Sequence, residues 1–162
     1  MEQITDMRDD LLDQYNRACQ MFYTILEQTP EDKWNAGPDP YSTPAVLAYH
    51  TIECLDYYAW DQSRAPYPNW GYRFGKPWWE MSPEEMPRKA ELVAYLKEIQ
   101  ASTVRQFELM TDADLAAPHL PEEGSGKTVL GHWIYALRHT MHHQGALAAV
   151  LLSFGITYDS WA

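Results

Sequence analysis

The chain has 162 residues, of which 46% are hydrophobic and 22% charged. This is the size and composition of one globular domain, which we expect to span residues 1–162. The formal net charge of −11 would repel nucleic-acid phosphates and anionic membrane surfaces, so we expect no nucleic acid and no membrane as a partner. Because no secretory signal or bilayer-length apolar run is visible, we expect a cytoplasmic protein with Cys19 and Cys54 reduced.

Apolar residues that recur every three or four positions predict four long helices. The first covers residues 3–28 and ends at Thr29-Pro30. The second begins at residues 41–44, where Thr43 precedes Pro44, because proline suits the first position of a helix. It ends near Asp61, and its inward-facing stripe includes Leu47, His50 and Cys54.

Residues 62–82 are rich in proline, glycine and aromatic side chains. Prolines and glycines at this density prevent regular structure, so we expect a long aromatic-rich loop between the second and third helices. Loops of this length in compact domains are often functional. The aromatic side chains have three alternative roles: packing over the end of the bundle, roofing a pocket, or forming a dimer surface.

The third helix is predicted over residues 87–110, and residues 111–115 form a short helical turn. A loop at residues 118–127 leads to the fourth helix, residues 128–154, for which Gly155 is the expected C-terminal cap. No segment alternates as a half-buried strand does. The sequence therefore predicts an all-α protein: an antiparallel-type four-helix bundle with short extra helical turns.

Two histidines of the fourth predicted helix, His139 and His143, are four residues apart. This spacing places both side chains on one helix face, roughly 5–6 Å apart at Cβ, from where both imidazoles can reach one metal ion. A durable site needs a third ligand from another helix, and His50 is the best candidate because it lies on an inward-facing stripe. Three histidines leave positions open for water or substrate, as in catalytic sites.

Other polar residues near these positions have structural interpretations that we prefer. His142 points about 100° away from His143 around the helix and suits packing or an interface. His132 lies two turns before His139, too far for the same ion, and His119 is expected to face solvent in a loop. We expect Glu53 to be solvated, with a ligand or base role as the alternative, and Arg138 to pair on the helix surface.

The segments at residues 42–50 and 139–147 resemble the motifs of the DinB/YfiT-like superfamily of metal-dependent four-helix proteins. The second segment is similar to the family pattern H-x-x-H-H-x-G-Q-L, except that Ala146 stands where glutamine is common. The resemblance implies a metal triad of His50, His139 and His143, with nickel or zinc in many members, and frequently a homodimer. Imidazole ligands also suit iron.

The resemblance further implies a metal-dependent enzyme similar to thiol S-transferases that use bacillithiol or mycothiol as cosubstrate, acting on a small-molecule substrate. An open divalent metal favours the thiolate form of a bound thiol, and the thiolate is the nucleophile. The same metal could instead activate water, so a metal-dependent hydrolase is an alternative. A non-catalytic bundle that binds a metal or small ligand is another, because the sequence assigns no acid–base residue.

Overall fold

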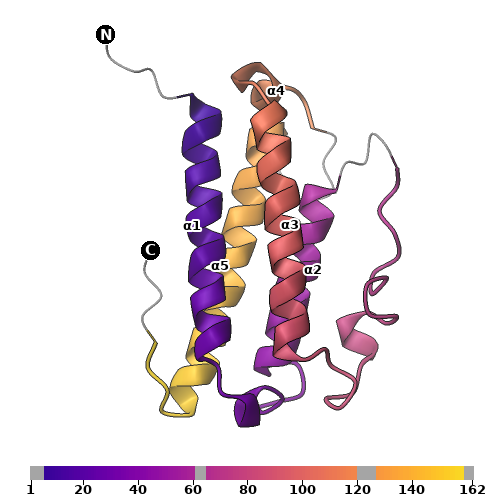
Figure 1. The fold of residues 1–162 in the computed structure, drawn as a ribbon, viewed down its shortest axis with the longest axis vertical. Helices are drawn as coiled ribbons and strands as arrows, with labels where there is room; N and C mark the ends of the chain where they lie inside the picture. The colour runs from indigo at the N-terminus through magenta and orange to yellow at the C-terminus, as the bar shows by residue number, and fades with distance from the viewer. Residues whose placement is uncertain (1–5, 61–64, 120–126, 159–162) are drawn as a thin grey trace.

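The computed structural model describes residues 6–60, 65–119 and 127–158. Within these residues the chain is helical, and its only bridge of strand type pairs Pro118 with Thr128. Five α-helices and two 3₁₀ turns follow in order (Figure 1): α1 Met7–Gln28, η1 Glu31–Lys33, α2 Pro44–Ala59, η2 Trp78–Glu80, α3 Lys89–Leu109, α4 Asp112–Ala116 and α5 Val129–Ser153. The predicted all-α class is confirmed, with four long helices and short extra turns.

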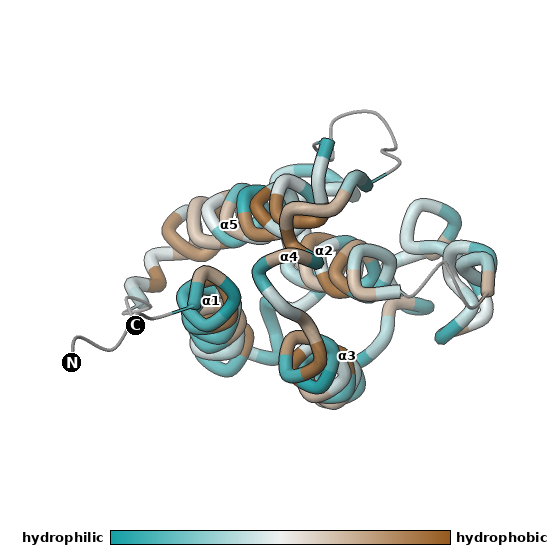
Figure 2. Tube along the Cα trace, turned by 90° about the horizontal axis from the view of Figure 1, so that it is seen from above, coloured by the Kyte–Doolittle hydropathy of each residue, from teal (hydrophilic) through white to brown (hydrophobic). Residues whose placement is uncertain are grey.

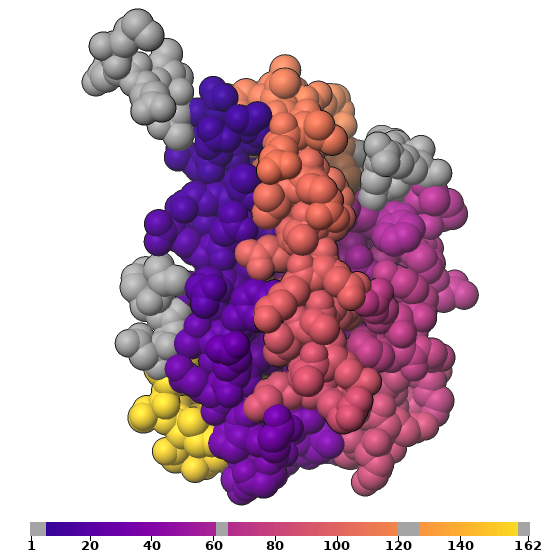
Figure 3. Space-filling model, viewed as in Figure 1, coloured from indigo at the N-terminus to yellow at the C-terminus, as the bar shows by residue number. Residues whose placement is uncertain are grey.

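The four long helices enclose one core. Helix α2 packs against α5 and α3, and α1 packs against α3 and α5, as the end-on view shows (Figure 2). On the face of the molecule that the space-filling view shows, α1 and α3 lie side by side (Figure 3). Burying one large apolar side chain stabilises the fold by roughly 1.5–3 kcal/mol. Each helix contributes such fully buried residues to the core: Tyr15, Phe22, Ile25, Leu26, Tyr49, Ile52, Leu92, Leu96, Phe107, Leu115, Leu147 and Leu151.

The helix directions differ from the antiparallel-type bundle that the sequence suggested. In Figure 1, α2 and α3 run in the same direction, whereas α1 and α5 run opposite to them. Two neighbouring parallel helices require a connection that returns along their full length, as in bundles with a long crossover. The connection between α2 and α3 is this crossover. Its described part, residues 65–88, runs along the flank of α2 rather than over the end of the bundle (Figures 1 and 2).

Local signals in the sequence fix the helix ends. The Thr43 side chain accepts a hydrogen bond from the Val46 amide at 3.3 Å, and Pro44 occupies the first turn of α2. Gly155 follows α5 with a φ of 75°, as expected for the residue after a helix. The predicted ends hold within two residues where they can be compared: α2 ends at Ala59 and α3 begins at Lys89. Residues 3–5 and 61 lie outside the described residues.

Hydrogen bonds accepted by two acidic residues of α2 hold the crossover in place. Glu53, expected to be solvated, is instead buried, and its carboxylate accepts a hydrogen bond from the Gly71 amide. Asp56 accepts hydrogen bonds from the hydroxyls of Tyr72 and Tyr95 at 2.6 and 2.5 Å. The Tyr49 hydroxyl donates to the carbonyl of Lys76 at 2.9 Å. The expectation for Glu53 was wrong because the crossover covers the face of α2 that carries this residue. The apolar periodicity of α2 does not indicate that a loop packs on that face.

No helix among the residues described here is long and apolar enough to cross a membrane.

Gly71 provides a test of the crossover. Its φ is 82°, and a Cβ added there would lie 2.1 Å from the carbonyl carbon of Lys76. Gly75 has a similar φ of 85° but no atom within 4 Å of an added Cβ, so it is a matched control. Strain at a positive φ costs about 1–3 kcal/mol in either Gly→Ala variant, and the clash adds to this only at Gly71. In urea unfolding we expect Gly71→Ala to lose at least about 1 kcal/mol more stability than Gly75→Ala; equal losses would contradict the tight packing.

Candidate metal centre

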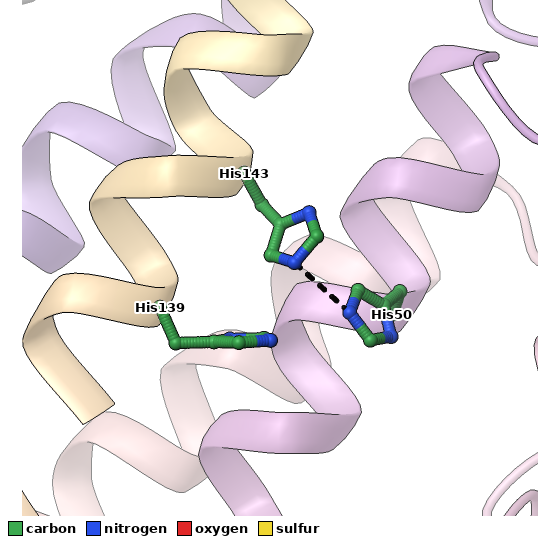
Figure 4. A group of neighbouring side chains, drawn as sticks. All are labelled: His50, His139 and His143. Carbon is green, nitrogen blue, oxygen red and sulfur yellow. Dashed lines mark hydrogen bonds between the residues drawn. The ribbon is translucent and has the colours of Figure 1, made fainter. Parts of the chain in front are cut away.

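Helices α2 and α5 bring three histidines together. His50 projects from α2, and His139 and His143 project from successive turns of α5 toward it (Figure 4). One ring nitrogen from each lies within 4.8 Å of the others, and no other group of three metal-ligating side chains forms among the described residues. The three residues singled out in the sequence are thus adjacent in space.

The imidazole rings are oriented with nitrogens toward a common point. The Nε2 atoms of His50 and His143 are 3.1 Å apart (Figure 4). The ring centroid of His143 lies 4.4 Å from those of His50 and His139, and the latter two are 5.1 Å apart. All three residues are partly exposed. An ion held by them would therefore remain accessible to a small molecule.

The electrostatic surroundings keep the three imidazoles neutral. Burial, aided by the neighbouring His143, lowers the pKa of His50 to about 4. Burial and the nearby histidines likewise lower the pKa of His139 to about 3, and that of His143 falls for the same reasons. A neutral imidazole is the form that coordinates a metal. The convergence of the three ring nitrogens and the neutral form of the imidazoles both fit a divalent transition metal, so the three-histidine group could hold such an ion.

Aromatic side chains surround the histidine cluster. The Trp78 ring, from η2 in the crossover, meets His50 edge-on with centroids 4.9 Å apart. The ring centroid of Tyr58, from α2, lies 5.6 Å from that of His139, and the ring centroid of Tyr135, from α5, lies 6.3 Å from it. Of the roles considered for the aromatic loop, covering the histidine cluster is the one that the contact of Trp78 with His50 matches.

The three rings differ in the contacts of their Nδ1 atoms, the ring nitrogens other than the Nε2 atoms. The Nδ1 atom of His50 lies 3.7 Å from the Sγ atom of Cys54. The Nδ1 atoms of His139 and His143 are buried and have no hydrogen-bond partner in the structure. Cys54 and Cys19 are both buried and free, as expected, and burial raises the pKa of the Cys54 thiol to about 12. The contact to His50 was missed, although the four-residue spacing could have indicated it.

The remaining histidines lie outside the cluster. His132 is buried on α5, and its Nε2–H donates to the carbonyl of Tyr58 at 2.9 Å. His119, expected to face solvent, is half-buried with its ring centroid 4.3 Å from that of His132. His142 is exposed beside His143, with ring centroids 4.9 Å apart. None of these three belongs to the converging group.

Two charged residues near the cluster have partners outside it. Glu53 directs its carboxylate at Gly71 in the crossover and is not part of the converging group. Burial and the charge of Asp56 raise the pKa of Glu53 to about 7. Arg138, expected to pair on the helix surface, places its guanidinium 5.0 Å over the ring of Tyr135. Neither residue supplies a metal ligand.

Comparison with known proteins agrees with the fold. The model of the DinB superfamily matches residues 14–147. A crystal structure of a conserved protein from Enterococcus faecalis has the same fold, with a TM-score of 0.71 and 19% sequence identity over 94% of this chain and 99% of that one. No curated protein matches the sequence significantly. Because the family model matches most of its length, this chain belongs to the DinB superfamily.

Proposed function

We propose that the chain binds one divalent transition metal through His50, His139 and His143 and uses it as a thiol S-transferase on a small-molecule substrate. The convergence of three neutral, partly exposed imidazoles from two helices carries this proposal. Nickel and zinc are the ions we favour, and iron also suits imidazole ligands. The cosubstrate would be a low-molecular-weight thiol of the bacillithiol or mycothiol kind.

When bound, such an ion supplies Lewis-acid chemistry, which favours the deprotonated form of a thiol at neutral pH. In the transfer the thiol loses its proton to solvent, its sulfur forms a bond to an electrophilic carbon, and the leaving group departs with the electrons of the broken bond. The three histidines would hold the ion. The aromatic rings of Trp78, Tyr58 and Tyr135 lie beside the cluster and would border a substrate bound there.

The composition of the cluster favours thiol chemistry over hydrolysis. Metal-dependent hydrolases commonly place a carboxylate beside the ion to take a proton from water, as in the HExxH motif. Within the described residues the converging group contains no carboxylate, and Glu53 is engaged by Gly71. A free thiol has a pKa of about 8.5 and needs less help to lose its proton than water does.

Metal content tests the proposed site. We expect untagged wild-type protein to bind about one zinc or nickel ion per chain, as the three-ligand site implies. His143→Ala should weaken binding by more than about 100-fold, because losing an outer-shell partner alone costs 10–100-fold. Chelator competition and mass spectrometry of the metal measure this. His142→Ala is the matched control, since His142 is adjacent, exposed and outside the cluster; equal loss in both variants would contradict the assignment.

Binding of a thiol to the metal tests the proposed cosubstrate. Adding 2-mercaptoethanol to cobalt-loaded protein should change its visible spectrum, because thiolates are metal ligands, whereas ethylene glycol at the same concentration should not. A positive result would justify a screen of thiols and electrophiles for transfer. Full metal binding with no response to the thiol would instead favour the hydrolase, or a bundle that binds metal without catalysis.

We also propose that the chain forms a homodimer through the outer face of α5. Ile134, Met141 and Leu152 lie along one stripe of this helix and are 51%, 37% and 57% exposed. Gly145 lies on the same stripe, and a Cβ added there would meet no atom within 4 Å. Helix α5 contains no Asp or Glu, although the chain has a net charge of −11. Two copies can therefore approach along α5 without opposing carboxylates.

The dimer is tested by introducing charge on this stripe. The double variant Ile134→Glu/Leu152→Glu should be monomeric, because it would bury carboxylates against the partner. Light scattering after size-exclusion chromatography measures the mass. Leu109→Glu is the control, since Leu109 is an 83% exposed apolar residue on α3. A monomeric wild type, or dissociation by the control alone, would contradict this interface.

A further inference from the structure

A metal-binding histidine uses one ring nitrogen for the ion, and the partner of the other nitrogen fixes the orientation of the ring. The three histidines differ in this respect. His50 directs Nε2 toward His143, at 3.1 Å, and Nδ1 toward the Sγ atom of Cys54, at 3.7 Å. The Nδ1 atoms of His139 and His143 have no such partner in the structure. His50 alone is therefore held at its outer nitrogen.

The contact between Cys54 and His50 is built into α2. The two residues are four positions apart, so one helix face presents both side chains. Cys54 is 6% exposed and His50 is partly buried, so neighbouring side chains restrict the movement of each. Trp78 meets the same imidazole edge-on at 4.9 Å. The His50 ring is thus confined by a thiol on one side and an indole on another.

We propose that Cys54 is a positioning residue of the metal site, whose Sγ accepts a hydrogen bond from the Nδ1–H of His50 and so leaves Nε2 free for the ion. This inference rests on the proposed metal binding. A carboxylate or carbonyl is the usual partner of a metal-ligating histidine. A thiol is a weaker acceptor and neutral, so it orients the ring without placing negative charge behind it.

The geometry separates this role from two others. Cys54 is not a fourth ligand, because Sγ lies at the Nδ1 side of the ring and the converging group includes His50, His139 and His143 but no cysteine. It is also not a transfer nucleophile, because it is buried and its Sγ contacts the Nδ1 atom of His50. Its effect on the metal must therefore act through the His50 ring.

Metal affinity of cysteine variants tests the role. Cys54→Ala should raise the dissociation constant for zinc about tenfold, the lower end of the range for losing an outer-shell partner. Cys54→Ser should stay within about threefold of wild type, because a hydroxyl also accepts a hydrogen bond. Cys19→Ala is the matched control, since it removes the other buried thiol, on α1. Unchanged affinity in Cys54→Ala, or an equal loss in Cys19→Ala, would overturn the proposal.

A second readout needs no metal and separates this inference from the proposed function. In metal-free protein the ¹⁵N chemical shifts of the His50 ring should change in Cys54→Ala and stay constant in Cys19→Ala, because only Cys54 contacts that ring. Ring shifts unaffected by Cys54→Ala would overturn the contact itself. If the ring responds but the wild type binds no metal, the proposed function fails, and with it the positioning role, while the contact stands.

Discussion

The packing of α2 against α5 is the contact on which the candidate site depends. Neither helix alone supplies three histidines close enough for one ion: α5 carries His139 and His143, with His132 two turns away, and His50 comes from α2. The converging nitrogens lie within 4.8 Å of one another, whereas sliding one helix by a single turn would move its side chains by about 5.4 Å. The register of this interface, held by buried residues such as Ile52 and Leu147, therefore decides whether the cluster exists.

The helix directions explain how the crossover takes part in the site. Because α2 and α3 are parallel neighbours, the chain must return along the flank of α2 before α3 begins (Figure 1). Glu53 and Asp56 hold this return segment through Gly71 and Tyr72, and Trp78 then reaches His50. A connection required by topology thus also supplies one wall of the histidine cluster.

Local patterns predicted the helices and the histidine pair, because both depend on spacing within one segment. Thr43 caps α2, Gly155 follows α5, and His139 and His143 share a helix face, all as expected. Periodicity does not say which helices are neighbours or in which direction they run, so the parallel pair and the path of the crossover were not predictable. The burial of Glu53 depends on the Gly71 amide, from a segment with no regular pattern, and could not be foreseen either.

X-ray absorption of the zinc-loaded, untagged protein tests the central claim most directly, since it reports the ligands of the bound ion. The account predicts nitrogen or oxygen neighbours at about 2.0–2.1 Å. The more distant scattering should be that of three imidazoles, from His50, His139 and His143, and any further ligand should bind through nitrogen or oxygen. A sulfur neighbour at about 2.3 Å, or scattering from fewer than three imidazoles, would contradict a site built by α2 and α5 from these histidines.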